Sequence, residues 1–238
     1  VGAYFESLGP TTVEGANLLA TVGGILSLPS LVSYAHGGNG GPSDVRLEAS
    51  GEGGVLDLPA LTTITGPNSD WESLLIQALG GGRVNLRAVT QIVGPPGYGG
   101  GLRGTQILAE GAGSVVDLSG LTDFLDSGNR PSSPLQFKDG GQVLAGNLTT
   151  IIGLSLRAGP GQVLSLPSLR SFEHSAYAGA GDVYLSAEGP GSVLDLPALT
   201  TITGPNGDWE NLYIQALGGG RVNLRAVTQI VGPPGYGG

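Results

Sequence analysis

The chain has 238 residues, of which 45 are glycine and only 12% are charged. The glycine follows no strict three-residue period, which excludes collagen, and the 39% of apolar residues argue against wholesale disorder. Ten basic residues against 19 acidic ones give a net charge of −9, which opposes binding to nucleic acid because phosphates must be neutralised by basic side chains.

The sequence contains no cysteine, which rules out disulfides, thiol nucleophiles and thiolate metal sites. No apolar run approaches the roughly 18 to 20 residues that cross a bilayer, so we expect no membrane span. The opening residues 1–10 lack the basic and apolar regions of a signal peptide. Because the chain begins without Met and ends inside a repeat, we expect it to be a piece of a longer protein.

Short apolar patterns recur along the chain and predict its strands. Each has the form L-x-L-x-x-L-x-x-I, whose alternating apolar residues indicate a short strand followed by a second one. In chain order they are Leu26/Leu28/Leu31/Tyr34, Leu56/Leu58/Leu61/Ile64, Val84/Leu86/Val89/Ile92, Val116/Leu118/Leu121/Phe124, a shortened Leu144/Leu148/Ile151, Leu164/Leu166/Leu169/Phe172, Leu194/Leu196/Leu199/Ile202 and Val222/Leu224/Val227/Ile230. Five such repeats fill 138 residues, or about 28 residues each.

A further apolar run precedes most of these patterns. These runs alternate apolar with polar residues and end at glycine, which indicates a strand that leads into a tight corner. They are 44–51, 74–81, 105–113, 154–161 and 182–189. After the corner, Pro59 and its equivalents bend the chain between the remaining two strands. Each repeat therefore predicts three short strands, and no segment sustains a helical period.

The chain also repeats itself at a longer distance, with a 138-residue shift and no gap, so that Val55 aligns with Val193. Residues 55–100 match residues 193–238 at all but three of 46 positions, which are Ser69/Gly207, Ser73/Asn211 and Leu75/Tyr213. We interpret the chain as one domain over residues 1–238 in which 1–100 matches 139–238 and 101–138 is an intervening coil. Stacked repeats tolerate such duplication, because each repeat contacts only its neighbours.

This repeat pattern resembles that of a right-handed parallel β-helix, or β-solenoid, of the kind found in bacterial cell-surface and secreted adhesin-type proteins. The resemblance implies an all-β fold of eight to nine coils, in which each leucine stacks above its counterpart in the next coil. An alternative is a horseshoe similar to a leucine-rich repeat, since L-x-L-P-x-L-x-x-I also resembles the strand side of that repeat. The connecting segments here are glycine-rich and strand-like, and the asparagine of the typical leucine-rich turn is missing, which favours the β-helix.

Two outward columns of polar residues are predicted along such a stack. One contains Thr11, Thr62, Thr90, Thr122, Thr149, Thr200 and Thr228, with Val32 and Arg170 interrupting it. Stacked threonine is used by ice-binding faces, but β-branched residues also simply suit exposed strands. The other contains Ser27, Asp57, Asn85, Asp117, Ser165, Asp195 and Asn223. Its oxygens suggest a possible Ca²⁺ site, while hydrogen-bonded polar positions that avoid like-charge repulsion explain the same spacing.

The loops carry the candidate ligand-contact residues. The only two tryptophans each lie between acidic residues, and tyrosines occur in the neighbouring loops; the set is Asp70, Trp71, Glu72, Tyr98, Asp208, Trp209, Glu210 and Tyr236. Aromatic faces beside carboxylates bind sugar rings, and paired carboxylates can cleave glycosidic bonds. The alternative is that each loop holds itself in place, with the aspartate capping a turn and the tryptophan covering a coil.

No catalytic constellation stands out, and no catalytic, cofactor or metal residue is predicted. His36 and His174 are equivalent in the duplication and lie about five coils apart, too far to share a metal ion. We therefore expect a structural or adhesive segment of a larger extracellular or bacterial cell-surface protein, with polysaccharide or another surface component as partner. The runner-up is a polysaccharide lyase or hydrolase. Its candidate residues are Arg46, Arg83, Arg87 and Asp57, with Arg221, Arg225 and Asp195 in the second block. Exposed strand edges at the ends of a solenoid also favour end-to-end self-association.

Overall fold

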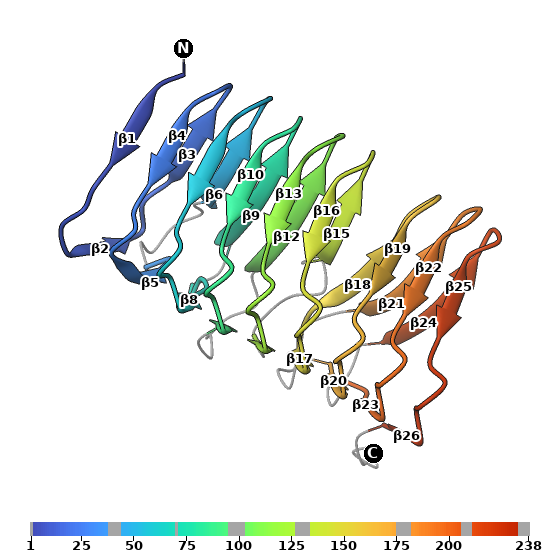
Figure 1. Ribbon diagram of the computed structural model, residues 1–238. Coiled ribbons are helices and arrows are strands. Elements are labelled where there is room, and N and C mark those ends of the chain that lie inside the picture. The colour runs from blue at the N-terminus through green and yellow to red at the C-terminus, as the bar shows by residue number, and fades with distance from the viewer. Residues whose placement is uncertain are drawn as a thin grey trace.

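The computed structural model describes residues 2–37, 44–69, 71–94, 103–126, 134–174, 182–205 and 211–232. Over these residues the chain forms 26 short strands, and every strand pairing is parallel. The strands wind into a parallel β-solenoid with three faces, which extends from the N-terminus at one end to the C-terminus at the other (Figure 1). None of the described segments is helical, so this part of the chain offers no helix that could cross a bilayer.

Face A is built from the L-x-L strands. It contains β1 (Tyr4–Glu6), β4 (Ile25–Ser27), β7 (Val55–Asp57), β10 (Arg83–Asn85), β13 (Val115–Asp117) and β16 (Gln142–Leu144), followed by a separate sheet of β19 (Val163–Ser165), β22 (Val193–Asp195) and β25 (Arg221–Asn223). A β-turn ends most of these strands. In the turn after β7, for example, the Leu61 N–H donates to the Leu58 carbonyl at 3.2 Å, with Pro59 at the position where its fixed φ suits a turn.

Face B is built from the strands that follow this turn. It is one continuous sheet of β2 (Thr11–Glu14), β5 (Leu31–Ala35), β8 (Thr63–Thr65), β11 (Gln91–Val93), β14 (Asp123–Leu125), β17 (Thr150–Ile152), β20 (Ser171–Glu173), β23 (Thr201–Thr203) and β26 (Gln229–Val231). These are the strands predicted at the last apolar member of each pattern.

Face C is built from the runs that precede each L-x-L strand. It contains β3 (Leu18–Thr21), β6 (Asp44–Ser50), β9 (Ser73–Leu79), β12 (Gly104–Glu110), β15 (Pro134–Lys138), β18 (Ser155–Ala158), β21 (Val183–Glu188) and β24 (Leu212–Leu217). The prediction of three strands per repeat is confirmed. The leucine-rich horseshoe is not, because the strands line three faces instead of one concave face.

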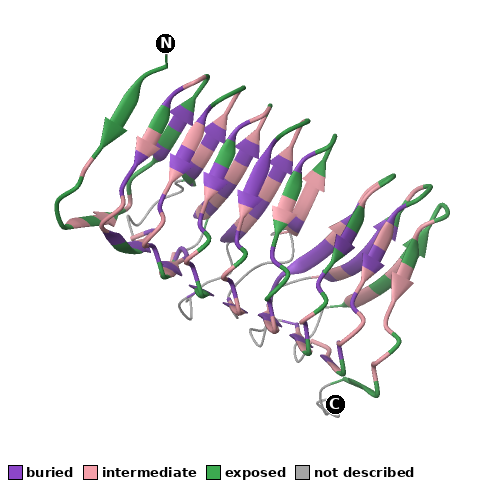
Figure 2. Ribbon diagram, in the orientation of Figure 1, coloured by how far each residue is buried: buried purple, intermediate pink, exposed green. Residues whose placement is uncertain are grey.

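The core runs along the axis because the strand register places equivalent residues of successive coils opposite each other. In face A, Leu56 lies opposite Val84, which lies opposite Val116, and all three are at most 1% exposed. Figure 2 shows buried positions alternating with intermediate or exposed ones on many of the strands. This alternation is what a strand produces when one of its sides faces a core.

The predicted count of eight to nine coils is slightly too high. The structure forms about six turns of about 29 residues each. The longest unbroken stack in face A has six strands, from β1 to β16. The predicted repeat length agrees with the structure.

Candidate functional site

The candidate loop at residues 68–72 lies at the corner where face B leads into face C. Of the predicted ligand-contact residues, the structure describes only Trp71 and Glu72. Asp70, Tyr98, Asp208, Trp209, Glu210 and Tyr236 lie outside the described residues, so their predicted role is still a prediction.

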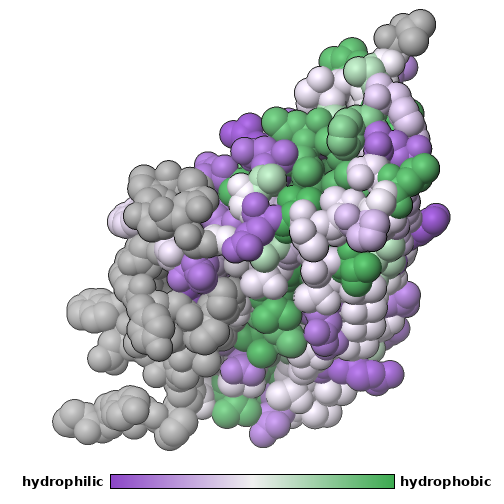
Figure 3. Space-filling view, turned by 90° about the vertical axis from the view of Figure 1, so that its left-hand side faces the viewer, coloured by the Kyte–Doolittle hydropathy of each residue, from purple (hydrophilic) through white to green (hydrophobic). Residues whose placement is uncertain are grey.

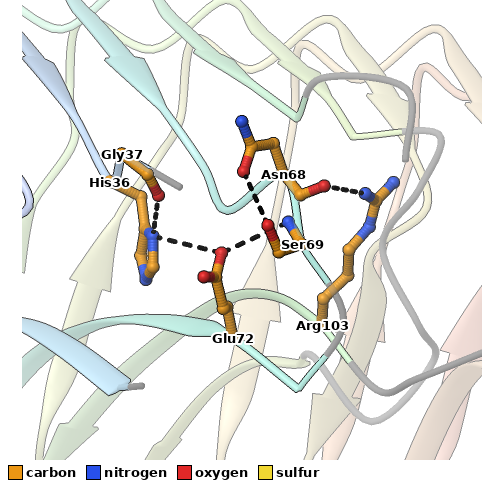
Figure 4. Close-up of polar contacts among 6 residues, drawn as sticks. All are labelled: His36, Gly37, Asn68, Ser69, Glu72 and Arg103. Carbon is orange, nitrogen blue, oxygen red and sulfur yellow. Dashed lines mark hydrogen bonds and ion pairs between the residues drawn. The ribbon is translucent and has the colours of Figure 1, made fainter. Parts of the chain in front are cut away.

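Glu72 points into the solenoid and is completely buried. One of its carboxylate oxygens, Oε2, accepts the Ser69 N–H at 3.2 Å and lies 3.6 Å from Nδ1 of His36, which is also fully buried (Figure 4). Nδ1 of His36 is 2.7 Å from the Gly37 carbonyl, which can only accept a hydrogen bond, so this nitrogen carries the proton. The carboxylate therefore closes its own loop and also contacts the preceding coil.

Trp71 points the other way. Its φ is +65°, a left-handed backbone conformation that is rare for bulky residues and costs about 1–3 kcal/mol, and its side chain is 58% exposed. The turn thus places neighbouring residues on opposite sides of the coil wall. Trp71 and Glu72 do not share a surface, so a sugar ring stacked on Trp71 would not contact the Glu72 carboxylate.

Arg103 links the same corner to the next coil. Its guanidinium donates through Nη1 to the Asn68 carbonyl at 3.2 Å, and the side chain is only 6% exposed (Figure 4). Directly beside it, the Gly104 N–H donates to the Glu72 carbonyl at 3.2 Å. Three successive coils therefore meet at one polar cluster, which we call the corner cluster. It contains the buried residues His36, Glu72 and Arg103, with the exposed Asn68 and the partly buried Ser69 of the loop.

Sequence reasoning did not predict the contact between His36 and Glu72. A signal for it exists, because both residues recur in the second half with the 138-residue shift, as His174 and Glu210. His174 is likewise buried, at 1% exposure. The two histidines lie at the ends of β5 and β20, five strands apart in face B, which confirms that they cannot bind one metal ion together.

The threonine column exists, and its hydroxyls are part of the ladder between coils. The Thr149 hydroxyl donates to the Thr122 carbonyl at 3.0 Å, and the Thr122 hydroxyl donates to the Thr90 carbonyl at 3.1 Å. The same bond recurs from Thr62 to Val32, from Thr90 to Thr62, from Thr200 to Arg170 and from Thr228 to Thr200. Thr11 departs from the column, since it lies opposite Leu31 beside a shift in register.

The carboxylate and amide column is also linked internally. Asp57 accepts hydrogen bonds from the Ser27 hydroxyl and from the Asn85 amide, and Asp195 accepts the same two bonds from Ser165 and Asn223. These contacts satisfy the carboxylates with neutral donors from the coils on both sides. Among the residues that the structure describes, no group of three or more His, Asp or Glu side chains could hold a metal ion.

The residues considered for a hydrolase do not form one site. Arg46 lies on β6 of face C and contacts Glu48 at 3.7 Å, whereas Asp57 and Arg83 lie on β7 and β10 of face A. Asp57 is already engaged by Ser27 and Asn85. The described residues of this set thus contribute to two different faces.

Fold and candidate site together define a parallel β-solenoid whose described polar columns bind coil to coil. Comparison with known proteins adds no family to that description. No family model, curated protein or solved structure matches this chain.

Proposed function

We propose that this chain is a structural and adhesive segment of a larger extracellular or cell-surface protein, like the adhesin-type solenoids that its repeats resemble. The polar columns support a structural role, because the threonine hydroxyls and the Asp57 carboxylate bind neighbouring coils. A catalytic carboxylate needs contact with its substrate, whereas Glu72 is completely buried.

The observation that carries the adhesive part is the conformation of Trp71. A strained backbone persists only where surrounding contacts hold it, and such strain concentrates at binding sites. Here the buried Glu72 carboxylate and the Ser69 N–H hold the turn, while Trp71 is 58% exposed. An exposed aromatic ring on a turn held in this way suits stacking against a sugar, so the proposed partner is a polysaccharide or glycan.

The test is incubation with a panel of soluble and insoluble polysaccharides, with and without Ca²⁺. Retention of the protein and release of new reducing ends are both measured. We expect retention without release, and we expect it to be lost in the double variant Trp71→Ala with Trp209→Ala. Phe5→Ala is the matched control, because Phe5 is an equally exposed aromatic residue on β1, outside the loop.

Release of sugar ends would overturn the proposal in favour of a polysaccharide-degrading enzyme. An equal loss of retention in the Phe5→Ala control would show that retention depends on non-specific contacts of exposed aromatic residues. Absence of retention on every polymer would remove the adhesive part and leave a spacer. A change with Ca²⁺ would point to a cation as part of the contact.

A further inference from the structure

The solenoid is open on one side between β16 and β19. Face A ends at β16 and starts again at β19, and in face C the strands β15 and β18 pair only through Pro134↔Ser155 and Leu135↔Leu156. Beyond those two pairs, β15 pairs only with β12 and β18 pairs only with β21, so β15 and β18 diverge from each other. Figure 1 shows the resulting separation in the row of strands.

The separation is a groove of about 920 Å³, lined by residues 136–144 on one wall and 157–165 on the other, with Glu188. We call it the junction groove. Its volume falls within the roughly 300–1,000 Å³ typical of ligand pockets. Apolar side chains reach solvent on both walls, since Leu144 is 42% exposed and Val163 is 58% exposed. Lys138 and Arg157 lie in the lining with Asp139 and Glu188, so both charge signs are present.

Both walls present backbone groups that are paired elsewhere in face A. The first residue of a face A strand donates its N–H to the preceding coil: Ile25 to Ala3, Val55 to Gly24 and Val193 to Gln162. Val163 occupies this position. No backbone hydrogen bond joins 136–144 to 157–165, all of which the structure describes.

The opposite wall shows the complementary pattern. The residue after a face A strand donates its N–H to the following coil, as Leu28 does to Asp57 and Leu166 does to Asp195. Ala145 occupies this position after β16 and makes no such bond to the described coil that follows. The junction groove is therefore bordered by two free strand edges, and free edges recruit further strands.

The first half of the chain shows what such an edge binds. With the 138-residue shift, β16 corresponds to β1 and β19 to β4, and β1 pairs with β4 through Tyr4↔Ile25, Phe5↔Leu26 and Glu6↔Ser27. The strand edges of β4 and β19 have nearly the same sequence, because Ile25–Leu31 and Val163–Leu169 differ only at their first residue. The edge of β19 thus matches one that holds an extended strand.

We propose that the junction groove binds one extended segment of polypeptide, which pairs with β16 on one side and with β19 on the other. Such strand addition takes its affinity from main-chain hydrogen bonds and its specificity from alternate side chains. The middle residue of the segment takes the register position that Phe5 has opposite Leu26, which places it between Val143 and Leu164. The partner is accordingly a segment with an apolar middle residue and no proline within the paired stretch. This site is additional to the glycan contact at Trp71.

The probe is a synthetic peptide with the sequence of residues 2–9, GAYFESLG, titrated into the full-length protein. Amide hydrogen exchange, followed by NMR, reports where it pairs. We expect saturable binding with slowed exchange at the amides of Val143, Ala145, Val163 and Ser165. Methylating the backbone nitrogen of the peptide's phenylalanine removes one donor without touching the protein, and we expect at least tenfold weaker binding.

Val163→Pro tests the wall itself. Proline is tolerated at the first residue of an edge strand. At residue 163 it removes an N–H that makes no hydrogen bond within the described chain, but that the bound peptide would need as a donor. We expect at least tenfold weaker binding of the peptide. Val163→Ile is the matched control, because it installs the residue found at Ile25, and binding is expected to be unchanged.

Four results would overturn the proposal. Slow exchange at Val163 and Ala145 before any peptide is added would mean that the groove closes on itself, as β1 closes on β4. Slowed exchange confined to β1 or β25 would place the peptide on an outer edge of the solenoid. Equal binding by the N-methylated peptide would mean that the main chain is not recognised. Absence of binding at millimolar peptide would also exclude the site.

Discussion

At the scale of residues, the polar side chains of this protein act between coils rather than within them. Glu72 contacts His36 of the preceding coil, and Arg103 of the next coil bonds to the Glu72 loop. Burial raises the pKa of Tyr34, whose hydroxyl donates to the Ala16 carbonyl at 2.8 Å. Such groups are costly to bury and hold one particular register, because removing a partner leaves the other polar group buried.

The corner cluster yields a prediction for Glu72→Ala. Removing one partner of a buried polar contact typically costs about 1–3 kcal/mol, whereas an exposed ion pair contributes about 0–1 kcal/mol. We expect the free energy of unfolding to fall by about 3 kcal/mol in Glu72→Ala, measured by urea denaturation. Glu110→Ala is the control, because Glu110 pairs with Lys138 and both side chains are nearly half-exposed, so the loss there should stay below about 1 kcal/mol. Similar losses in both variants would contradict a stabilising role of the corner cluster.

At the scale of elements, the corner between face C and face A limits what the sequence can contain. Successive coils are close enough at this corner that a side chain on one would enter the backbone of the coil before it. A Cβ atom on Gly82 would lie 2.1 Å from the Ala49 carbonyl oxygen, and one on the equivalent Gly220 would lie 2.2 Å from that of Ala187. These glycines are required by close approach, since their φ is not in the left-handed region.

Gly82→Ala is therefore expected to destabilise the protein. The added methyl group forces the neighbouring backbone to move, and overpacking of this kind costs about 1–3 kcal/mol. Gly146→Ala makes the same chemical change at a turn where a Cβ atom would meet nothing within 4 Å. That variant should be neutral or stabilising by about 0.4–1 kcal/mol, because alanine restricts the unfolded chain. Thermal unfolding of the two variants checks the difference, and a stable Gly82→Ala would refute the packing argument.

At the scale of the whole molecule, stability builds up coil by coil. Each coil contacts only its neighbours, and the first and last described coils expose apolar side chains. On the first these are Tyr4, Phe5 and Leu8, and on the last Ile214 and Ile230. Figure 3 shows hydrophobic residues running through the middle of the end that carries β1. This surface is consistent with the predicted end-to-end self-association, which stays a prediction.

Deleting a complete coil should leave the fold intact. Removal of residues 193–220, which make up one coil, brings Arg221 to the register position of Val193. We expect an unchanged β-sheet signal in circular dichroism and a urea m-value lower by about 12%, the share of the chain removed. Removal of residues 193–206 is the control, because half a coil places apolar side chains on the outer side. If both deletions unfold the protein, the free energy of unfolding is not a sum of contributions from individual coils.

The first half and the second half show where sequence reasoning ends. Their short coils have the same length, because Tyr4 and Ile25 are as far apart in the sequence as Gln142 and Val163, which predicts the same closed junction in both. The structure closes the first and opens the second. The second short coil has described coils on both sides, and β15 and β18 each follow a different neighbour in face C. A short coil between two longer ones cannot remain paired with both along all three faces.

The sequence by itself determined the strands, their grouping in threes and the length of the repeat. These features follow from alternation within a few residues and from periodicity, so they can be read without knowing the contacts. The tertiary structure alone decided that Glu72 turns inward to His36 while Trp71 turns outward, and that the junction groove stands open. Those outcomes depend on how residues from different coils meet in space, and no local pattern encodes the fit between one coil and the next.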